Sequence, residues 1–329
     1  MPMPVTVSVV GLGNFGRLHA QTIAGLAEAE LVGLVDSRQA ALDGASRQFS
    51  AVPRWNNLDA AIAECPAEAW IVASSTAAHA PIARALLSAG RRVLLEKPLA
   101  GNLADAESLA PLVAEDSQNL MLAHIVLFNS EFRQLCDEVE RRGKLKYIDC
   151  VRHRPTTTMQ AFPGESPLHL TMVHDLYCLV ALTGGLEPQR FEAALRRNAE
   201  GACDLATARL CWPGGLTASL TASFLTPPGM PADGFDRLEL FGDGWAARIQ
   251  PNPRPLELWD DRARWPMGLE ISASSGNPAG MLAEELREFF RVVRGEQPVP
   301  LGARYSDGLQ VQRWLENLEA IGARQNHVD

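Results

Sequence analysis

The stretch VTVSVVGLGNFG (residues 5–16) decides the fold of this chain. A β-branched run ends in a glycine-rich turn, and a helical pattern follows the turn. Gly11 permits the tight bend, Gly13 lets the backbone approach a pyrophosphate, and Gly16 lets the helix pack closely on the strand. The N-terminus of that helix offers free N–H groups and a partial positive charge to phosphates. The stretch therefore predicts a strand, a phosphate-binding turn and a helix.

A carboxylate follows at the distance that such a turn requires. Asp36 ends the next apolar run, ELVGLVD (30–36), 20 residues after Gly16, where it can accept hydrogen bonds from the adenine-ribose hydroxyls. A carboxylate at this place repels a 2′-phosphate and favours NAD. Arg38 is either a solvated loop cation or a partner for that phosphate, so NADP stays an alternative. The expected nucleotide-binding residues of the turn and the strand end are Gly11, Gly13, Asn14, Phe15, Gly16, Asp36, Ser37 and Arg38.

Length and composition are those of a globular protein with two domains. The chain has 329 residues, 47% of them hydrophobic and 21% charged. Its formal net charge of -9 argues against nucleic-acid binding, which needs clustered Lys and Arg. The six cysteines form no CxxC pair and no metal-ligand spacing with histidine, so we expect no metal site and a reducing compartment. We find neither a signal-peptide pattern nor a membrane-length apolar run, and we expect a cytoplasmic protein with a small-molecule ligand.

Two patterns of secondary structure divide the chain. Apolar runs alternate with helical segments up to about residue 122, which predicts a doubly wound parallel sheet. Later strand patterns follow one another, and in GLTASLTASF (215–224) apolar residues alternate strictly with Thr and Ser. The hydroxyl face of that strand meets either solvent or another subunit. We expect an α/β protein with a Rossmann domain over 1–122 and an α+β domain over 123–329, which has an open, mainly antiparallel sheet.

A lysine ends one of the predicted buried strands. LLEKPLAG (94–101) places Glu96, Lys97 and Pro98 at the carboxyl end of that strand, the edge at which open α/β sheets bind ligands. Burying a lysine there is costly unless it has a partner or a function. Lys97 therefore either takes part in chemistry or extends to solvent beside Glu96.

Five segments together carry a resemblance to a known family: GLGNFG, ASSTAAH (73–79), LLEKPLA, AHIVLFN (123–129) and MVHDLYCLVALTGG (172–185). In this order and spacing, over essentially the whole chain, the sequence resembles the glucose–fructose oxidoreductase / inositol dehydrogenase / rhizopine-catabolism (Gfo/Idh/MocA) family. The EKP and HD elements are more specific than the glycine turn. The H-x-x-x-F-N segment from His124 to Asn129 is similar to that of the sugar and sugar-nucleotide dehydrogenases of the family.

The resemblance implies an NAD(P)-dependent dehydrogenase or reductase that acts on a secondary alcohol of a sugar, sugar derivative or polyol. It also implies an active site in the cleft between the two domains, and a homodimer or homotetramer built through the C-terminal sheet. Lys97 would contact nicotinamide and the substrate hydroxyl, and His174 would act as general base. Glu96 would support Lys97 and contact the nicotinamide ribose. The family positions that line the nucleotide are Ser74, Ser75, Thr76 and His79, and weaker candidates for substrate contact are His124, Arg154, His169, Leu170 and Asp175.

Three places depart from the family pattern. Leu170 stands where most relatives have an aspartate four residues before the catalytic histidine, on the same helix face. Leu127 stands where many have arginine, and Ser74-Ser75 replaces a Thr-Pro pair. Asp175 cannot take over from the missing acid, because it lies about 100° round the helix from His174; His169 is either a stand-in or an ordinary loop histidine. The chain is therefore a dehydrogenase with a more apolar pocket or, alternatively, a dinucleotide-binding sensor or regulator with impaired catalysis.

Overall fold

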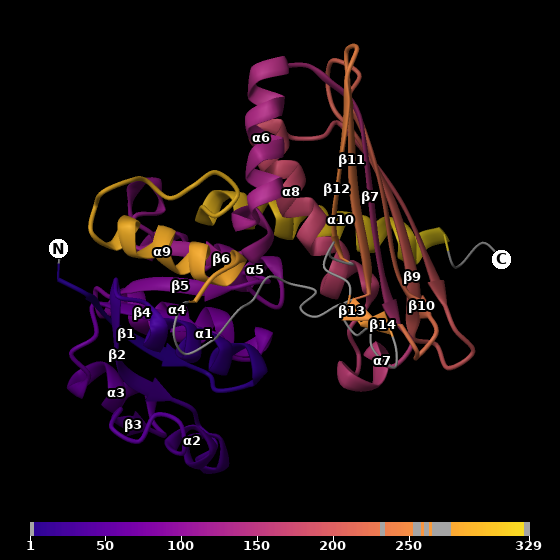
Figure 1. The fold of residues 1–329 in the computed structure, drawn as a ribbon. Helices are drawn as coiled ribbons and strands as arrows, with labels where there is room; N and C mark the ends of the chain where they lie inside the picture. Colours follow the sequence, from indigo (N-terminus) through magenta and orange to yellow (C-terminus); the bar gives the residue numbers. More distant parts are fainter. Residues whose placement is uncertain (1–2, 231–233, 253–257, 260–262, 265–277, 326–329) are drawn as a thin grey trace. The chain divides into compact units, whose positions relative to one another are not determined.

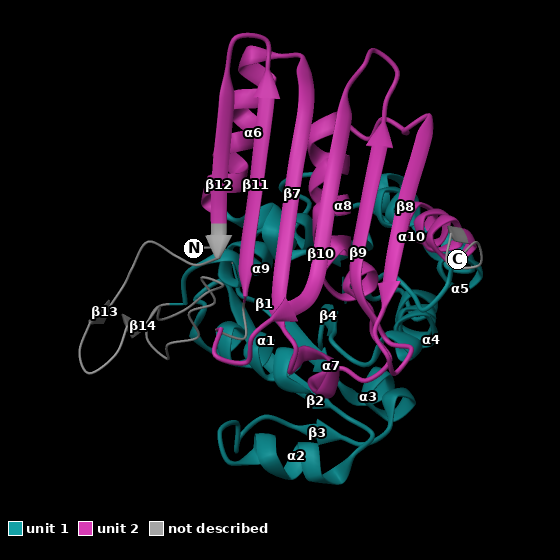
Figure 2. Ribbon diagram, turned by 90° about the vertical axis from the view of Figure 1, so that its right-hand side faces the viewer, with its two compact units in different colours: residues 1–129, 270–312 teal, residues 130–269, 313–329 magenta. Residues whose placement is uncertain are grey.

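The computed structural model describes residues 3–230, 234–252, 258–259, 263–264 and 278–325. The chain forms two compact units, residues 1–129 with 270–312 (unit 1) and residues 130–269 with 313–329 (unit 2) (Figure 2). The sequence patterns predict a division at residue 122. Unit 1 instead extends to Asn129 and also includes residues 270–312.

Unit 1 contains the predicted parallel sheet (Figure 1). Its six strands lie in the order β3-β2-β1-β4-β5-β6, and every neighbouring pair is parallel. This is the order of a Rossmann fold, in which ligands bind at the carboxyl ends of the strands. The strands are β1 (Val5–Val10), β2 (Ala29–Val35), β3 (Arg54–Trp55), β4 (Ala69–Val72), β5 (Arg92–Glu96) and β6 (Leu120–Ala123).

The helices of unit 1 follow the strands as the sequence predicts. Helix α4 ends at Ser88, and Gly90, which follows the C-cap residue Ala89, has the left-handed φ of 71° that favours glycine. A late helix, α9, also belongs here: its apolar stripe is buried, and it packs on α1 and η3. The helices are α1 (Asn14–Gly25), α2 (Gln39–Ser46), α3 (Leu58–Glu64), α4 (Thr76–Ser88), α5 (Leu103–Glu107), α9 (Met281–Val293) and the short 3-10 helices η1 (Ala110–Leu112), η2 (Glu115–Ser117) and η3 (Ile125–Phe128).

Unit 2 contains the second predicted sheet, whose broad face Figure 2 shows. Its strands lie in the order β12-β11-β7-β10-β9-β8, with β10 and β7 parallel and the other neighbours antiparallel. The mainly antiparallel sheet is therefore confirmed. The strands are β7 (Leu145–Pro155), β8 (Arg190–Arg197), β9 (Cys203–Cys211), β10 (Thr217–Thr226), β11 (Phe235–Gly242) and β12 (Ala246–Asn252), and the short β13 (Leu258–Trp259) and β14 (Ala263–Arg264) form a separate pair.

Helices cover one face of this sheet (Figure 2). On β10, Leu220 and Phe224 are buried on the covered side, whereas Thr217 and Thr221 stay partly exposed on the other, so the predicted alternation is confirmed. Helix α10 contributes Trp314, whose ring lies 6.0 Å from that of Trp212. The helical segments are α6 (Ser130–Arg142), α7 (Thr158–Ala161), the π-helix η4 (Leu168–Met172), α8 (Val173–Thr183) and α10 (Tyr305–Gln325), the last from residue 313 onward. Within the described residues, no helix is both long and apolar enough to cross a membrane.

Candidate active site

The glycine turn after β1 has the geometry that the sequence predicts. Gly11 has a φ of 92°, and a Cβ there would lie 2.6 Å from the carbonyl oxygen of Ala73. A Cβ on Gly16 would lie 1.8 Å from the carbonyl oxygen of Gly11. Both positions therefore exclude a side chain, whereas a Cβ on Gly13 would meet nothing within 4 Å. That open space is where a pyrophosphate can approach the backbone.

Helix α1 begins directly at this turn and presents its N-terminus to the same place. Gly13 is the N-cap residue, no side chain caps the helix, and no acidic residue lies in its first turn. The first N–H groups and the helix dipole therefore remain available to an anion. Asn14 is exposed and accepts a hydrogen bond from Arg17 Nη2 at 2.9 Å, and Phe15 packs edge-on against His19. These features fit a dinucleotide pyrophosphate.

Asp36 connects the end of β2 to the glycine turn. Its carboxylate is 6% exposed and accepts hydrogen bonds from the backbone N–H of Leu12 at 2.7 Å and of Arg38 at 2.9 Å. The Arg38 guanidinium binds both carboxylate oxygens, each at 3.1 Å. Burial alone would raise the pKa of Asp36, but the hydrogen bonds from Arg38 and Leu12 lower it below its usual value. Asp36 is thus an anion with Arg38 beside it, and the neighbouring Ser37 is exposed.

The loop after β4 and the loop after β5 are tied together by His79. Its ring is 1% exposed, with Nδ1 2.7 Å from the carbonyl oxygen of Pro98 and Nε2 3.2 Å from that of Ser74. Both ring nitrogens thus face backbone carbonyls, so we replace the expected nucleotide contact of His79 by an indirect, loop-holding role. Ser75 caps α4 without a side-chain hydrogen bond and is exposed, and Thr76 is partly exposed. These two remain candidates for nucleotide contact.

Lys97 follows β5 at the same edge of the sheet as the glycine turn, because parallel strands end on one side. The lysine is partly exposed, and its backbone N–H donates to Glu96 Oε2 at 3.2 Å. Glu96 is 8% exposed, and its Oε1 lies 2.8 Å from Nε2 of the fully buried His19. Glu96 is therefore held between α1 and the backbone of Lys97.

His174 lies in the first turn of α8 in unit 2 and is partly exposed. Its neighbour Asp175 is 1% exposed and pairs with Arg152 Nε at 2.8 Å. Arg152 Nη1 also pairs with Asp236 at 2.8 Å, and Arg154 pairs with the other oxygen of Asp236 at 2.6 Å. Burial raises the pKa of Asp175 to about 6, against the opposing charge of Arg152. Asp175 and Arg154 were expected to contact substrate; both instead belong to an internal ion cluster that fixes α8 to the sheet.

The remaining candidates for substrate contact also differ from expectation. His124 is 0% exposed, so its imidazole lies in the core rather than toward a ligand. Leu170 and His169 lie in the π-helix η4, which runs directly into α8, so Leu170 lies about one helical turn before His174. Leu170 is partly exposed, and His169 Nε2 lies 3.2 Å from Glu319.

Three buried residues at these places were missed by the sequence analysis: His19, Glu285 and Arg152. Each one interrupts an apolar pattern. Glu285 lies within the apolar stripe of α9, three residues after Leu282, and is 0% exposed. A charge at a core position of an amphipathic helix is the signal that could have identified it, because buried charges need a partner or a function.

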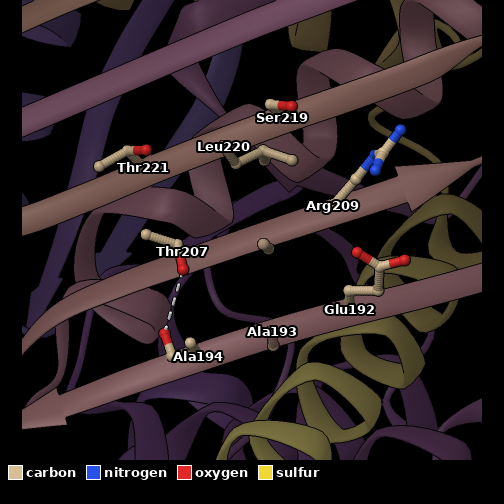
Figure 3. Close-up of a pocket in the computed structure, with 9 residues that line it drawn as sticks. Glu192, Ala193, Ala194, Thr207, Arg209, Ser219, Leu220 and Thr221 are labelled. Atoms are coloured by element: carbon tan, nitrogen blue, oxygen red, sulfur yellow. Dashed lines mark hydrogen bonds between the residues drawn. The ribbon is translucent and has the colours of Figure 1, made fainter.

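A hollow on the open face of the unit 2 sheet is a separate feature (Figure 3). Its charged residues are Glu192 and Arg209, which lie opposite each other on β8 and β9. It holds no imidazole, thiol or lysine for proton transfer, so we do not assign chemistry to it. The lining residues are Glu192, Ala193, Ala194, Thr207, Ala208, Arg209, Ser219, Leu220 and Thr221.

Comparison with known proteins agrees with this geometry. Residues 5–124 match the family described as "Oxidoreductase family, NAD-binding Rossmann fold" (GFO_IDH_MocA), which confirms the resemblance that the sequence motifs carry. The chain is 29% identical over 312 residues to the UDP-N-acetylglucosamine 3-dehydrogenase of Acidithiobacillus ferrooxidans, covering 93% of both proteins. It is 31% identical over 183 residues to inositol 2-dehydrogenase 1 of Saccharopolyspora erythraea, covering 53% of this chain and 52% of that protein.

Solved structures share the fold of the whole chain. Scyllo-inositol dehydrogenase from Lactobacillus casei, solved with bound NAD(H) and scyllo-inositol, superposes with a TM-score of 0.83. The match covers 98% of both chains at 20% sequence identity. An identity this low shows a common fold, with the Rossmann unit and the open sheet in the same chain.

Proposed function

We propose that this chain, whose Rossmann unit is that of the Gfo/Idh/MocA oxidoreductases, is an NAD-dependent dehydrogenase that acts on a secondary alcohol of a sugar, sugar derivative or polyol. The observation that carries the proposal is in unit 1. An open glycine turn, the Asp36 anion and Lys97 lie at one edge of a single parallel sheet. The dehydrogenases named among the relatives act on inositol and on a nucleotide sugar, which supports the substrate class.

Two side chains are proposed to carry out the proton chemistry and the orientation of substrate. When bound, the nicotinamide supplies the hydride acceptor or donor. Lys97 donates hydrogen bonds to the reacting oxygen, orients the carbinol carbon and stabilises the developing alkoxide. His174 accepts the hydroxyl proton as general base, since a neutral imidazole is available near neutral pH. The partial exposure of both residues leaves their side chains accessible to a substrate.

NAD is the proposed cofactor rather than NADP because of the charge at the end of β2. The Asp36 carboxylate already accepts from the backbone of Leu12 and from Arg38, and its lowered pKa keeps it negative over the physiological range. A 2′-phosphate beside it would meet that negative charge. Arg38 is held by Asp36 and offsets this repulsion only in part.

Turnover and cofactor binding test the proposal. Purified protein is mixed with NAD and a panel of inositols, sugars and UDP-sugars, and NADH formation is followed by absorbance. The Lys97→Ala variant should lose at least about a hundredfold in kcat and retain NAD binding by calorimetry. Lys146→Ala removes a lysine that pairs with Asp243 on the unit 2 sheet, and it serves as the matched control. A Lys97→Ala variant that works at the wild-type rate would show that the assigned role is wrong.

A dinucleotide sensor without catalysis is the second candidate. It is favoured by Leu170 and Leu127, which stand where active relatives carry polar or charged residues. Such a protein would bind NADH in calorimetry yet form none from any alcohol of the panel. The same experiment therefore separates the two functions.

We also propose that a second copy of the chain covers the open face of the unit 2 sheet. The face carries the outward row Thr217, Ser219 and Thr221, and the hollow of Figure 3 lies on it. Six strands about 4.8 Å apart and about eight residues long give an area of roughly 750 Å². That is close to the ~800 Å² per partner of a standard protein interface. Glu192 and Arg209 lie opposite each other and give the face both charges, so the face can be complementary to that of a second copy.

A further inference from the structure

Three buried side chains meet next to the backbone of Lys97. His19 comes from α1, Glu96 from the end of β5 and Glu285 from α9. One ligand atom of each lies within 4.8 Å of those of the other two. His19 and Glu285 are 0% exposed, and Glu96 is 8% exposed. Glu285 has no part in the functions proposed above.

The two carboxyl groups of this cluster have different surroundings. Glu96 has His19 Nε2 at 2.8 Å and the backbone N–H of Lys97 at 3.2 Å, and hydrogen bonds of this kind favour a charged carboxylate. The backbone N–H of His124 interacts with the Glu285 carboxyl and opposes the rise of its pKa, but neither oxygen makes a hydrogen bond of ordinary length and angle, and neither does Nδ1 of His19. Two buried carboxylates so close together do not both ionise. The proton therefore belongs on Glu285, in agreement with its pKa, which burial and the charge of Glu96 raise well above the usual value.

We propose that Glu285 is a positioning residue that keeps its proton at neutral pH, so that Glu96 is the single anion of the cluster and stays fixed beside Lys97. The inference deepens the proposed function, since it takes Lys97 as the residue that orients the substrate. Glu285 acts on Lys97 through Glu96 and contacts neither cofactor nor substrate.

The elements around Glu285 bring few other charges to it. Helix α9 packs on α1, which contributes His19, and on η3, whose residues Ile125–Phe128 are all apolar. The end of β5 contributes Glu96. His124, the buried residue directly before η3, interacts with Glu285 through its backbone N–H. Among the described residues, the titratable side chains around Glu285 therefore belong to His19, Glu96 and His124. With one of the two carboxyl groups protonated, the carboxyl pair carries one negative charge.

A divalent cation is the other ligand that these donors could accept. A tetrahedral zinc ion with N and O ligands at about 2.0–2.2 Å separates its ligand atoms by about 3.3 Å. His19 Nε2 and Glu96 Oε1 lie only 2.8 Å apart, which is a hydrogen-bond distance. The geometry thus favours a proton over a metal ion.

Infrared spectroscopy of the protein without cofactor tests the protonation directly. The difference spectrum between wild type and Glu285→Gln at neutral pH should contain the carbonyl stretch of a protonated carboxylic acid, with the shift expected after ¹³C labelling of glutamate. Glu284→Gln is the control, since Glu284 lies on the same helix, pairs with Arg287 and is 38% exposed. Absence of the band from wild type overturns the inference whether or not the protein is an active dehydrogenase. Stoichiometric zinc or manganese in wild type, lost in Glu285→Gln, also overturns it.

Kinetics test the positioning role. Glu285→Leu fills the site without a polar group and should lower kcat/KM about tenfold and move the acid limb of its pH profile. Glu285→Gln, which resembles the protonated carboxyl, should stay within about twofold of wild type with an unchanged profile. Equal effects of Leu and Gln would indicate only a packing role and contradict the inference. If wild type turns over no alcohol, the proposed function fails, and the infrared result still decides the protonation of Glu285.

Discussion

Replacement of Arg152 by methionine tests whether the buried ion cluster of unit 2 holds α8 in place. The Arg152 side chain is 6% exposed and pairs with Asp175 and Asp236, each at 2.8 Å. In the variant, Asp236 keeps its ion pair with Arg154 at 2.6 Å, whereas Asp175 loses its ion pair with Arg152. Breaking a buried pair from one side costs about 3–5 kcal/mol. For a unit of this size we expect the melting temperature to fall by roughly 6–20 °C.

The loss should depend on pH, because the unpaired carboxyl can be protonated. Burial already raises the folded-state pKa of Asp175 to about 6 from its ordinary 3.8, and loss of Arg152 raises it further. A group with a raised folded pKa contributes stability that is complete below the unfolded pKa and is lost as pH rises through the folded pKa. The destabilisation by Arg152→Met should therefore be smaller near about pH 5 than near about pH 8.

Urea unfolding, followed by hydrogen exchange of peptides from α8 and β7, measures the effect in unit 2 itself. Arg237→Met is the matched control on the same sheet. The Arg237 side chain is 30% exposed and pairs with Asp149 and Glu239. Its replacement should lower the free energy of unfolding by less than about 1 kcal/mol. Arg152→Met combined with Asp175→Asn removes the bare carboxylate and should recover most of the loss. A loss below about 1 kcal/mol for Arg152→Met, or equal losses at both pH values, would refute the reasoning.

Four further predictions concern the edge of the Rossmann sheet and the open face. Asp36→Ala removes the anion and frees Arg38, so the affinity for NADP relative to NAD, measured by calorimetry, should rise about ten- to a hundredfold. The double variant Asp36→Ala/Arg38→Ala should lose that rise. NAD affinity of wild type should stay constant down to about pH 5, because the lowered pKa of Asp36 keeps its contribution until the pH falls below its ordinary value; an earlier decline contradicts this. His79→Ala should lower kcat/KM about tenfold with NAD affinity changed under about threefold, as expected for a residue that holds the loop of Lys97, and a matching loss of NAD affinity would indicate direct contact. Thr221→Arg should convert dimers to monomers in light scattering, and an unchanged mass would exclude this face as the contact.

The features predicted correctly from the sequence depend on local patterns. The β-branched run before Gly11 has one stable environment, a strand buried on both faces, and the turn after it permits only glycine at Gly11 and Gly16. Asp36 was identified for the same reason, since the distance from turn to acid is set by one strand–helix–strand unit. The alternation in β10 likewise fixes which side chains face the helices.

The features that the sequence did not predict depend on contacts between distant segments. The stripe of α9 shows that the helix is amphipathic, but a stripe does not specify its partner, and the partners here are α1 and η3. For this reason the sequence patterns alone put the division at residue 122, whereas the compact unit runs to Asn129 and includes residues 270–312. The buried meeting of His19 with Glu285 was missed too, because 266 positions separate them in the chain. Asp175 was a weak candidate for substrate contact, and its pairing with Arg152 could not be predicted because the two residues lie on different elements.

The structure also changes the weight of one of the two departures that favour a sensor. Leu127 lies in η3 and is 7% exposed, so it is a core residue of unit 1. Packing in the core therefore explains why an apolar side chain occupies this position. Leu170 lies in the π-helix η4, which runs directly into α8, so it stays about one helical turn before His174, and this departure keeps its weight. With Lys97 at the ligand edge and His174 partly exposed, the two residues proposed for proton transfer and substrate orientation remain accessible. Leu127 therefore does not argue for lost catalysis, and a dehydrogenase stays the better account of the chain.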